Sequence, residues 1–179
     1  MIDTAAQLFE HHGYAATGIN QILADSDTPR GSFYFHFKGG KEELGMQVIE
    51  HHQVVFSDRM SHLFTQASTV LAGVEGVLNA LAQQMAASGY QTGCPVTAIA
   101  TEMAGHSSQL RHCAEVSYEA WIHLIVPRLI AEGHTADQAY STTRALLCAI
   151  EGALILCRVY QHRGPLDDVK GQLKRLLTV

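Results

Sequence analysis

Hydrophobic positions recur every three to four residues along almost the whole chain, and no alternating segment indicates a pair of strands. In the first twelve residues the spacing i, i+3, i+4, i+7 predicts a helix whose apolar stripe comprises Ile2, Ala5, Ala6 and Phe9. Gly13 is expected to end this helix. A long helix is predicted to begin near Lys41, with an apolar face of Leu44, Val48, Ile49 and Val55. The pattern therefore indicates an all-α protein.

Between these two helices the pattern predicts two short helices joined by a tight turn. Thr17 is a suitable N-cap for the first short helix, whose apolar side chains are Ile19, Ile22 and Leu23. Residues 25–27 form the turn. Thr28 is expected to cap the second short helix, which Pro29 opens and whose buried side comprises Phe33 and Phe37. This arrangement over residues 17–37 predicts a helix-turn-helix.

After about residue 68 the predicted helices become longer. We expect them at residues 73–88, from Pro95 onward, at 107–132, at 136–162 and at 166–177. Thr135 and Gln138 have the spacing of a capping box in front of the helix at 136–162. In total the sequence predicts about nine helices, arranged as a three-helix head over residues 1–45 and a larger helical domain over residues 46–179.

The charge distribution changes how the net charge is interpreted. Hydrophobic residues make up 47% of the chain and charged residues 16%, which is typical of a globular protein, and the net charge is −5. Residues 28–41 nevertheless carry Arg30, His36, Lys38 and Lys41 without a single acidic residue. A short basic segment on an acidic body fits a protein that contacts DNA at one end only.

The cysteines and the apolar runs indicate a cytoplasmic protein. Cys94, Cys113, Cys148 and Cys157 lie far apart, without the spacing of a disulfide scaffold or a zinc site. No apolar run reaches the length of about 18 to 20 residues that spans a bilayer, so no membrane partner is expected. No basic segment followed by an apolar one opens the chain, so secretion is not expected either.

Two strings of residues near the N-terminus carry a more specific signal. The first is AQLFEHHGY at residues 6–14, followed by Thr17, Ile19 and Ile22; the second is GSFYFHFK at residues 31–38, followed by KEEL at 41–44. Together they resemble the first helix, the turn, the recognition helix and the start of helix four of the TetR family of bacterial regulators. The resemblance covers about the first 45 residues, and beyond them only the number and order of the helices match.

The resemblance implies which side chains contact operator DNA. Tyr34 and Lys41 match positions that hold backbone phosphates, and Thr17 and Thr28 lie at helix N-termini, which favour an anion. The front of the recognition helix, expected to meet base edges in the major groove, comprises Arg30, Gly31 and Ser32. Arg30 has the geometry to pair with guanine O6 and N7.

Three further side chains of this segment, Phe35, His36 and Lys38, have two interpretations each. Phe35 matches a DNA-facing position and would pack on a thymine methyl, although three phenylalanines on one short helix would also fit a buried cluster. His36 is a DNA contact or a structural hydrogen-bond donor, and Lys38 is a DNA contact or solvated surface. Phe33 and Phe37 are expected in the core.

Two features depart from the family pattern. Gly39-Gly40 replaces the usual Ser or Thr cap before the fourth helix, so that helix would begin less firmly anchored. The basic residues that often precede the first helix are also not found. Either this arm is lacking, which would weaken nonspecific phosphate affinity, or the chain as given begins after it.

The helix at 136–162 is apolar nearly all round, so we expect it to be buried on two sides. Its small residues would let a second helix approach closely, and they are Ala145, Ala149, Gly152 and Ala153. The resemblance implies a four-helix dimer interface formed by the last two helices of each subunit. A monomer in which this helix is simply central is the alternative.

An apolar ligand site is predicted around the helix at 107–132. Tyr118 and Trp121 share a face with Leu124 and Ile125, of which the last two are better explained as core. Soft and aromatic side chains complete the predicted pocket, namely Met85, Tyr90, Met103 and Leu147.

Cys94 precedes Pro95 at the expected start of a short helix, where the helix dipole would stabilise a thiolate. Residues 93–102 also resemble a Gly-Cys-motif subgroup of TetR regulators, some of which sense electrophiles. An inert, half-buried thiol is the alternative and is slightly favoured.

Together these patterns predict a homodimeric repressor that leaves a palindromic operator when it binds a small apolar, aromatic or electrophilic effector. No cofactor is expected. The adjacent pairs His11-His12 and His51-His52 have poor chelating geometry, so no metal site is expected, and no motif of a known enzyme class occurs. The other class that the sequence leaves open is a helical ligand-binding or adaptor protein that does not bind DNA.

Overall fold

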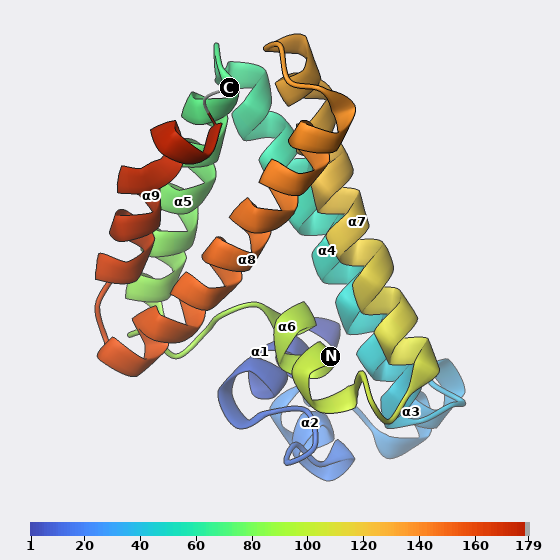
Figure 1. Cartoon of the computed structure of the whole chain (residues 1–179). Helices are drawn as coiled ribbons and strands as arrows, with labels where there is room; N and C mark the ends of the chain where they lie inside the picture. Colours follow the sequence, from blue (N-terminus) through green and yellow to red (C-terminus); the bar gives the residue numbers. More distant parts are fainter. Residues whose placement is uncertain (178–179) are drawn as a thin grey trace. The chain divides into compact units, whose positions relative to one another are not determined.

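The computed structural model describes residues 1–177, and within them the chain forms nine α-helices and no strand (Figure 1). The all-α prediction is therefore confirmed. In chain order the helices are α1 Ile2–His12, α2 Ile19–Asp25, α3 Arg30–His36, α4 Lys41–Gln66, α5 Val70–Ala87, α6 Pro95–Met103, α7 Ser108–Ala131, α8 Ala136–Tyr160 and α9 Gly164–Leu177.

Several helix ends follow from the residues that the sequence analysis singled out. Gly13 ends α1 with a φ of 87°, a conformation that side-chain-bearing residues rarely adopt. Thr135 and Gln138 form the predicted capping box of α8. Cys94 is the N-cap of α6, and Pro95 occupies its first position.

The capping roles predicted for two threonines are wrong. Gly18, not Thr17, is the N-cap of α2, and Pro29, not Thr28, is the N-cap of α3. The Thr17 hydroxyl is buried and donates toward the carbonyl oxygens of Leu8, at 3.2 Å, and Gly13, at 2.8 Å. Its side chain therefore anchors the end of α1 instead of capping the next helix.

The chain divides into two compact units. Unit 1 comprises Met1–Val54 and Cys94–Ser117, and unit 2 comprises Val55–Gly93 and the chain from Tyr118 onward. Unit 1 thus contains α6 together with the helix-turn-helix, and α6 packs against α1 (Figure 1). The predicted functional division into residues 1–45 and 46–179 stays a prediction, because these units reflect packing alone.

Unit 1 has an aromatic core. Phe9 and Phe33 are fully buried, and the rings of Phe33 and Phe37 lie 5.2 Å apart. Aliphatic side chains from α2 and α4 complete the core, namely Ile22, Leu44, Val48 and Ile49. The burial of Phe33 and Phe37 was predicted correctly, and these two side chains hold the inner face and the end of α3 against the core.

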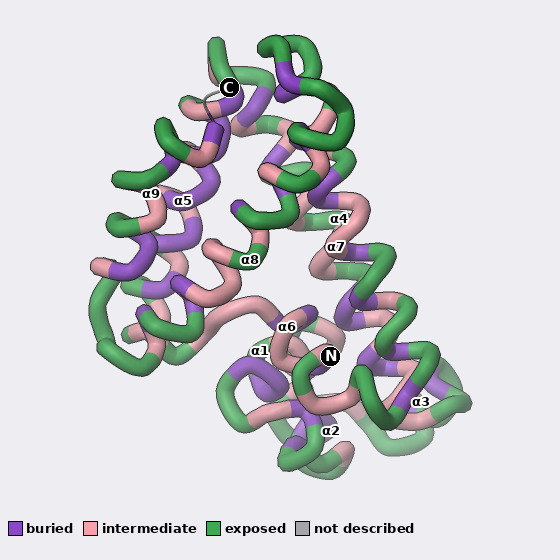
Figure 2. The backbone as a smooth tube through the Cα atoms, viewed as in Figure 1, coloured by how far each residue is buried: buried purple, intermediate pink, exposed green. Residues whose placement is uncertain are grey.

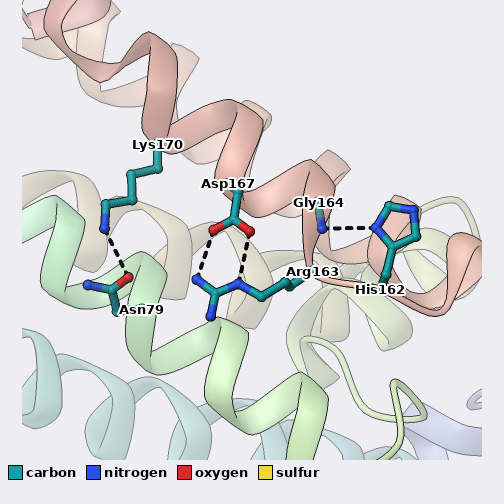
Figure 3. A network of polar contacts seen from close by, with 6 residues as sticks. All are labelled: Asn79, His162, Arg163, Gly164, Asp167 and Lys170. Carbon is teal, nitrogen blue, oxygen red and sulfur yellow. Dashed lines mark hydrogen bonds and ion pairs between the residues drawn. The ribbon is translucent and has the colours of Figure 1, made fainter.

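In unit 2, α5 packs against α8 and α9, and buried positions alternate with exposed ones along each of these helices (Figure 2). Polar contacts support the packing of α9 on α5: Lys170 Nζ donates to Asn79 Oδ1 at 3.1 Å (Figure 3). Directly before α9, the Arg163 guanidinium forms a two-bond ion pair with Asp167 of that helix, with distances of 2.9 and 2.8 Å. This pair raises the pKa of Arg163 and lowers that of Asp167.

Candidate nucleic-acid interface

The outer face of α3 presents an exposed set of aromatic and basic side chains. With Phe33 and Phe37 in the core, Tyr34 is 44% exposed and Phe35 is 74% exposed. Arg30, Gly31, His36 and Lys38 are also exposed, and Ser32 is half-buried. The exposure of Phe35 excludes the alternative in which all three phenylalanines belong to the core, whereas contact of Phe35 with DNA stays a prediction.

The exposed side chains of this face pack against neighbouring aromatic rings. The Arg30 guanidinium lies 6.0 Å from the centre of the Tyr34 ring, and that ring meets Phe33 edge-on at 5.0 Å. The rings of Phe35 and His36 meet edge-on at 5.1 Å. Arg30, Tyr34 and Phe35 therefore offer a guanidinium, a phenol hydroxyl and a large apolar ring, which are suited to a base edge, a phosphate and a thymine methyl, respectively.

Lys41 lies where α4 begins, and it is half-buried. Its Nζ donates to the Ala15 carbonyl oxygen at 3.3 Å and lies 4.4 Å from the centre of the Tyr14 ring. Burial lowers the pKa of Lys41, and the negative charge of Glu102 partly opposes that shift. The Glu43 carboxylate accepts the Gly39 N–H at 2.7 Å. This bond anchors the start of α4, where Gly39-Gly40 replaces the usual Ser or Thr cap.

Thr17 and Thr28 do not have the roles at helix N-termini that their sequence positions predicted. Thr17 is fully buried, and its backbone N–H donates to the Tyr14 carbonyl oxygen at 3.3 Å, so neither its side chain nor its backbone is exposed to a phosphate. Thr28 is half-buried, and its hydroxyl lies 2.9 Å from that of Ser26 in the turn before α3. Both side chains shape the helix-turn-helix from within.

One polar residue of unit 1 was missed by the sequence analysis. Glu102, on α6, accepts the backbone N–H groups of Tyr14 and Ala15 at 3.0 and 2.6 Å. The two partners lie 88 and 87 residues away in the chain. No local spacing or charge pattern in the sequence signals such a contact.

The residues predicted for a dimer interface fall into two groups. Ala145 is exposed, and Ala149 and Gly152 are half-buried along the same face of α8, whereas Ala153 is only 4% exposed and belongs to the core of unit 2. Further along α8 the structure exposes large apolar side chains, namely Ile155, Leu156, Val159 and Tyr160. The outer face of α8 is thus apolar for about four turns.

The residues predicted for a ligand pocket belong to both units. Cys94 and Met103 lie in unit 1, and the others, all in unit 2, are Met85, Tyr90, Tyr118, Trp121 and Leu147. Within unit 2 the Trp121 ring meets Tyr118 at 5.6 Å and Phe56 at 5.0 Å. The role of these residues as a ligand site stays a prediction.

A shallow depression in unit 2 lies between α4 and α5. None of the predicted ligand residues lines it; its walls are Phe56, Arg59, Met60, Leu63, Val77, Ala80 and Leu81. Over residues 1–177, no group of three or more His, Cys, Asp or Glu side chains is placed to hold a metal ion. No helix in that same range is long and apolar enough to cross a membrane.

Comparison with known proteins identifies the family. Residues 1–45 match the model of "Bacterial regulatory proteins, tetR family", and residues 70–172 match "Transcriptional regulator LmrA/YxaF-like, C-terminal domain". The HTH-type transcriptional regulator LmrA of Bacillus subtilis is 27% identical over 177 residues, covering 99% of this chain and 94% of the relative. The HTH-type transcriptional repressor NemR of Escherichia coli is 22% identical over 187 residues, covering 99% and 92%.

The fold agrees with solved structures of the family. The regulatory protein TetR from Rhodobacter sphaeroides superposes with a TM-score of 0.88 at 24% identity, covering 98% of this chain and 95% of that one. The matches do not separate a Gly-Cys-motif subgroup, which stays a prediction. The two family models together span the helix-turn-helix and most of the remaining helices, and the chain belongs to the TetR family of bacterial transcriptional regulators.

Proposed function

We propose that this chain is a homodimeric repressor that binds a near-palindromic operator through α2 and α3 and leaves it when a small apolar or aromatic ligand binds. The observation that carries the proposal is the outer face of α3, where Arg30, Tyr34 and Phe35 are exposed within a segment free of acidic residues. Buried Phe33 and Phe37 anchor that face from behind.

Dimerisation through α8 and α9 supports binding to two half-sites. The exposed apolar face of α8, from Ala145 to Tyr160, would leave large side chains in water in an isolated subunit. A two-fold dimer would bury them and present two recognition helices to successive major-groove faces of one operator. The repressor NemR provides a precedent for repression within the family.

An electrophoretic mobility shift against the region upstream of the protein's own coding sequence tests the proposal. Binding should be specific and should fall steeply as salt is added, because phosphate contacts release counterions. Absence of any salt-sensitive DNA binding would favour the other class, a helical ligand-binding or adaptor protein.

A second mechanism of release, through the thiol of Cys94, is favoured by one observation. Cys94 is half-exposed at the N-cap of α6, directly before Pro95, where the helix dipole stabilises a thiolate. If this thiol is the sensor, a quinone should release the parent protein from DNA and leave Cys94→Ser bound. If parent and variant respond alike, reversible binding of an apolar ligand explains release.

A further inference from the structure

The turn between α1 and α2 is held from two sides at a single residue, Ala15. The Ala15 N–H donates to a Glu102 carboxylate oxygen at 2.6 Å, and the Ala15 carbonyl oxygen accepts from Lys41 Nζ at 3.3 Å. The second Glu102 oxygen accepts the Tyr14 N–H at 3.0 Å. One residue from α6 and one from the start of α4 therefore fix the same three-residue turn.

Gly13 makes the close approach of Glu102 sterically feasible. A Cβ built at Gly13 would lie 2.5 Å from the Glu102 carboxylate oxygen, well inside van der Waals contact. The φ of Gly13, 87°, is also one that other residues adopt at a cost. The end of α1 is thus shaped to receive a carboxylate from α6.

This turn leads directly into the helix-turn-helix. Two residues after Ala15, Thr17 is fully buried and hydrogen-bonded to the end of α1, and α2 begins at Ile19. The direction of α2 is therefore set by the backbone that Glu102 holds. We infer that Glu102 is a positioning residue for operator recognition, through which α6 fixes the turn in front of α2.

The inference rests on operator binding by this chain, as proposed above, and links two segments that the family models treat separately. Glu102 belongs to the segment matched by the C-terminal model, residues 70–172, whereas Tyr14, Ala15 and Lys41 belong to the segment matched by the N-terminal model, residues 1–45. All four residues lie within unit 1. The head of this protein is thus incomplete without α6.

The chemistry of the contact predicts an order among variants. Carboxylate-to-N–H bonds are charge-assisted, so a carboxylate that takes two of them holds the turn firmly. Glu102→Gln keeps one acceptor oxygen and loses the charge, whereas Glu102→Ala loses both acceptors and leaves two N–H groups to water. Operator affinity should fall in the order parent, Glu102→Gln, Glu102→Ala.

The chain offers a matched control for the loss of such a contact. Glu132, directly after α7 in unit 2, accepts the Val70 N–H at 2.7 Å across 62 residues of sequence. Glu132→Ala removes a long-range carboxylate-to-backbone bond of the same kind. A role in general stability would appear in both variants, whereas a role in positioning the head would appear only at Glu102.

The experiment measures affinity for the duplex that the parent protein selects from a random-sequence pool, together with thermal unfolding of each variant. Glu102→Ala should bind this duplex about tenfold more weakly, equivalent to about 1.4 kcal/mol, and Glu102→Gln should fall in between. Glu132→Ala should bind it like the parent. Equal affinity of Glu102→Ala and the parent, or equal losses at Glu102 and Glu132, would overturn the inference.

Amide hydrogen exchange of the free proteins gives a readout independent of DNA. In Glu102→Gln and Glu102→Ala, exchange of the Tyr14 and Ala15 amides should accelerate, while that of the Phe37 amide, which donates to Phe33 within the core, should not. Unchanged exchange at Tyr14 and Ala15 would also overturn the inference. A parent protein that selects no duplex would instead refute operator binding itself, which is a separate failure.

Discussion

Units 1 and 2 are both built from helices but differ in the side chains that these helices expose. In unit 1 the short helix α3 exposes a cation, a phenol and an aromatic ring over an aromatic core, and polar contacts fix the turn between α1 and α2. In unit 2 the long helix α8 exposes a broad apolar face with few polar groups. The difference fits the proposal above, in which the first unit binds operator DNA and the second forms the dimer contact.

The largest effect should come from Gly152→Glu, which tests the apolar face of unit 2. A Cβ at Gly152 meets nothing within 4 Å, so the substitution leaves the isolated subunit intact while placing a charge in the proposed dimer contact. We expect a monomer by light scattering and loss of tight operator binding, because one head reads only a half-site. Ala153→Glu would not test this, since Ala153 is in the core.

Gly105→Glu is the control for this experiment. Gly105 is exposed, lies in unit 1 and likewise has no atom within 4 Å of a built Cβ. A dimer that survives Gly152→Glu would show that the interface lies elsewhere. The exposed apolar face of α8 would then not be the dimer contact of unit 2.

Arg30→Ala tests the recognition surface of unit 1. If Arg30 makes a bidentate contact with guanine, its loss should cost about 1–3 kcal/mol and relax the preference for that base pair. Lys38→Ala, also an exposed cation of the same segment, should weaken binding to all sequences alike. Competition binding with single-base variants of the operator separates the two. Unchanged base preference in Arg30→Ala would remove Arg30 from the base-reading set.

The sequence predicted the fold far better than the site. Strong helical periodicity, Gly13 and the Thr135–Gln138 box placed the helices, because these signals act within one or two turns. Burial of Phe33 and Phe37 followed from the same spacing. The prediction that Thr17 caps α2 was wrong because its hydroxyl instead bonds to carbonyl oxygens in and directly after α1. Packing of the folded chain, and not local sequence, determines these partners.

Contacts between distant segments were beyond prediction. Glu102 is one acidic residue among many in the sequence, and only the packing of α6 against α1 shows its role. The same holds for Ala153, whose small size suited an interface equally well but which the fold places in the core. Residue type alone does not distinguish these outcomes.

Tyr34→Phe should have a smaller effect than Arg30→Ala, because it removes one hydroxyl and keeps the ring. The ring packs edge-on against Phe33 and near Arg30, so the head should keep its stability. Loss of a hydrogen bond to a charged phosphate costs about 1.5 kcal/mol at the low end of its range, or roughly a tenfold loss in affinity. Equal affinity of Tyr34→Phe and the parent would show that the hydroxyl contacts no phosphate.

The smallest expected effect is on the pH dependence of folding stability, to which we expect a histidine of unit 1 to contribute. His51 and His52 are adjacent on α4, but His51 is exposed and paired with Asp3 at 3.2 Å, whereas His52 is half-buried. Burial, followed by repulsion from His51, lowers the pKa of His52 from 6.5 to about 4. Between these values the unfolded chain binds a proton that the folded protein does not, so stability falls as the pH drops from about 6.5 to about 4.

One such group contributes at most about 1.4 kcal/mol per pH unit. His52→Asn should therefore flatten the decline in unfolding free energy between pH 6.5 and 4.5, measured by urea denaturation at each pH. His51→Asn is the neighbouring control: it removes the like charge, so the pKa of His52 should rise and the decline should become shallower without disappearing. If His52→Asn and the parent show the same slope, the acid sensitivity of the protein arises outside this helix.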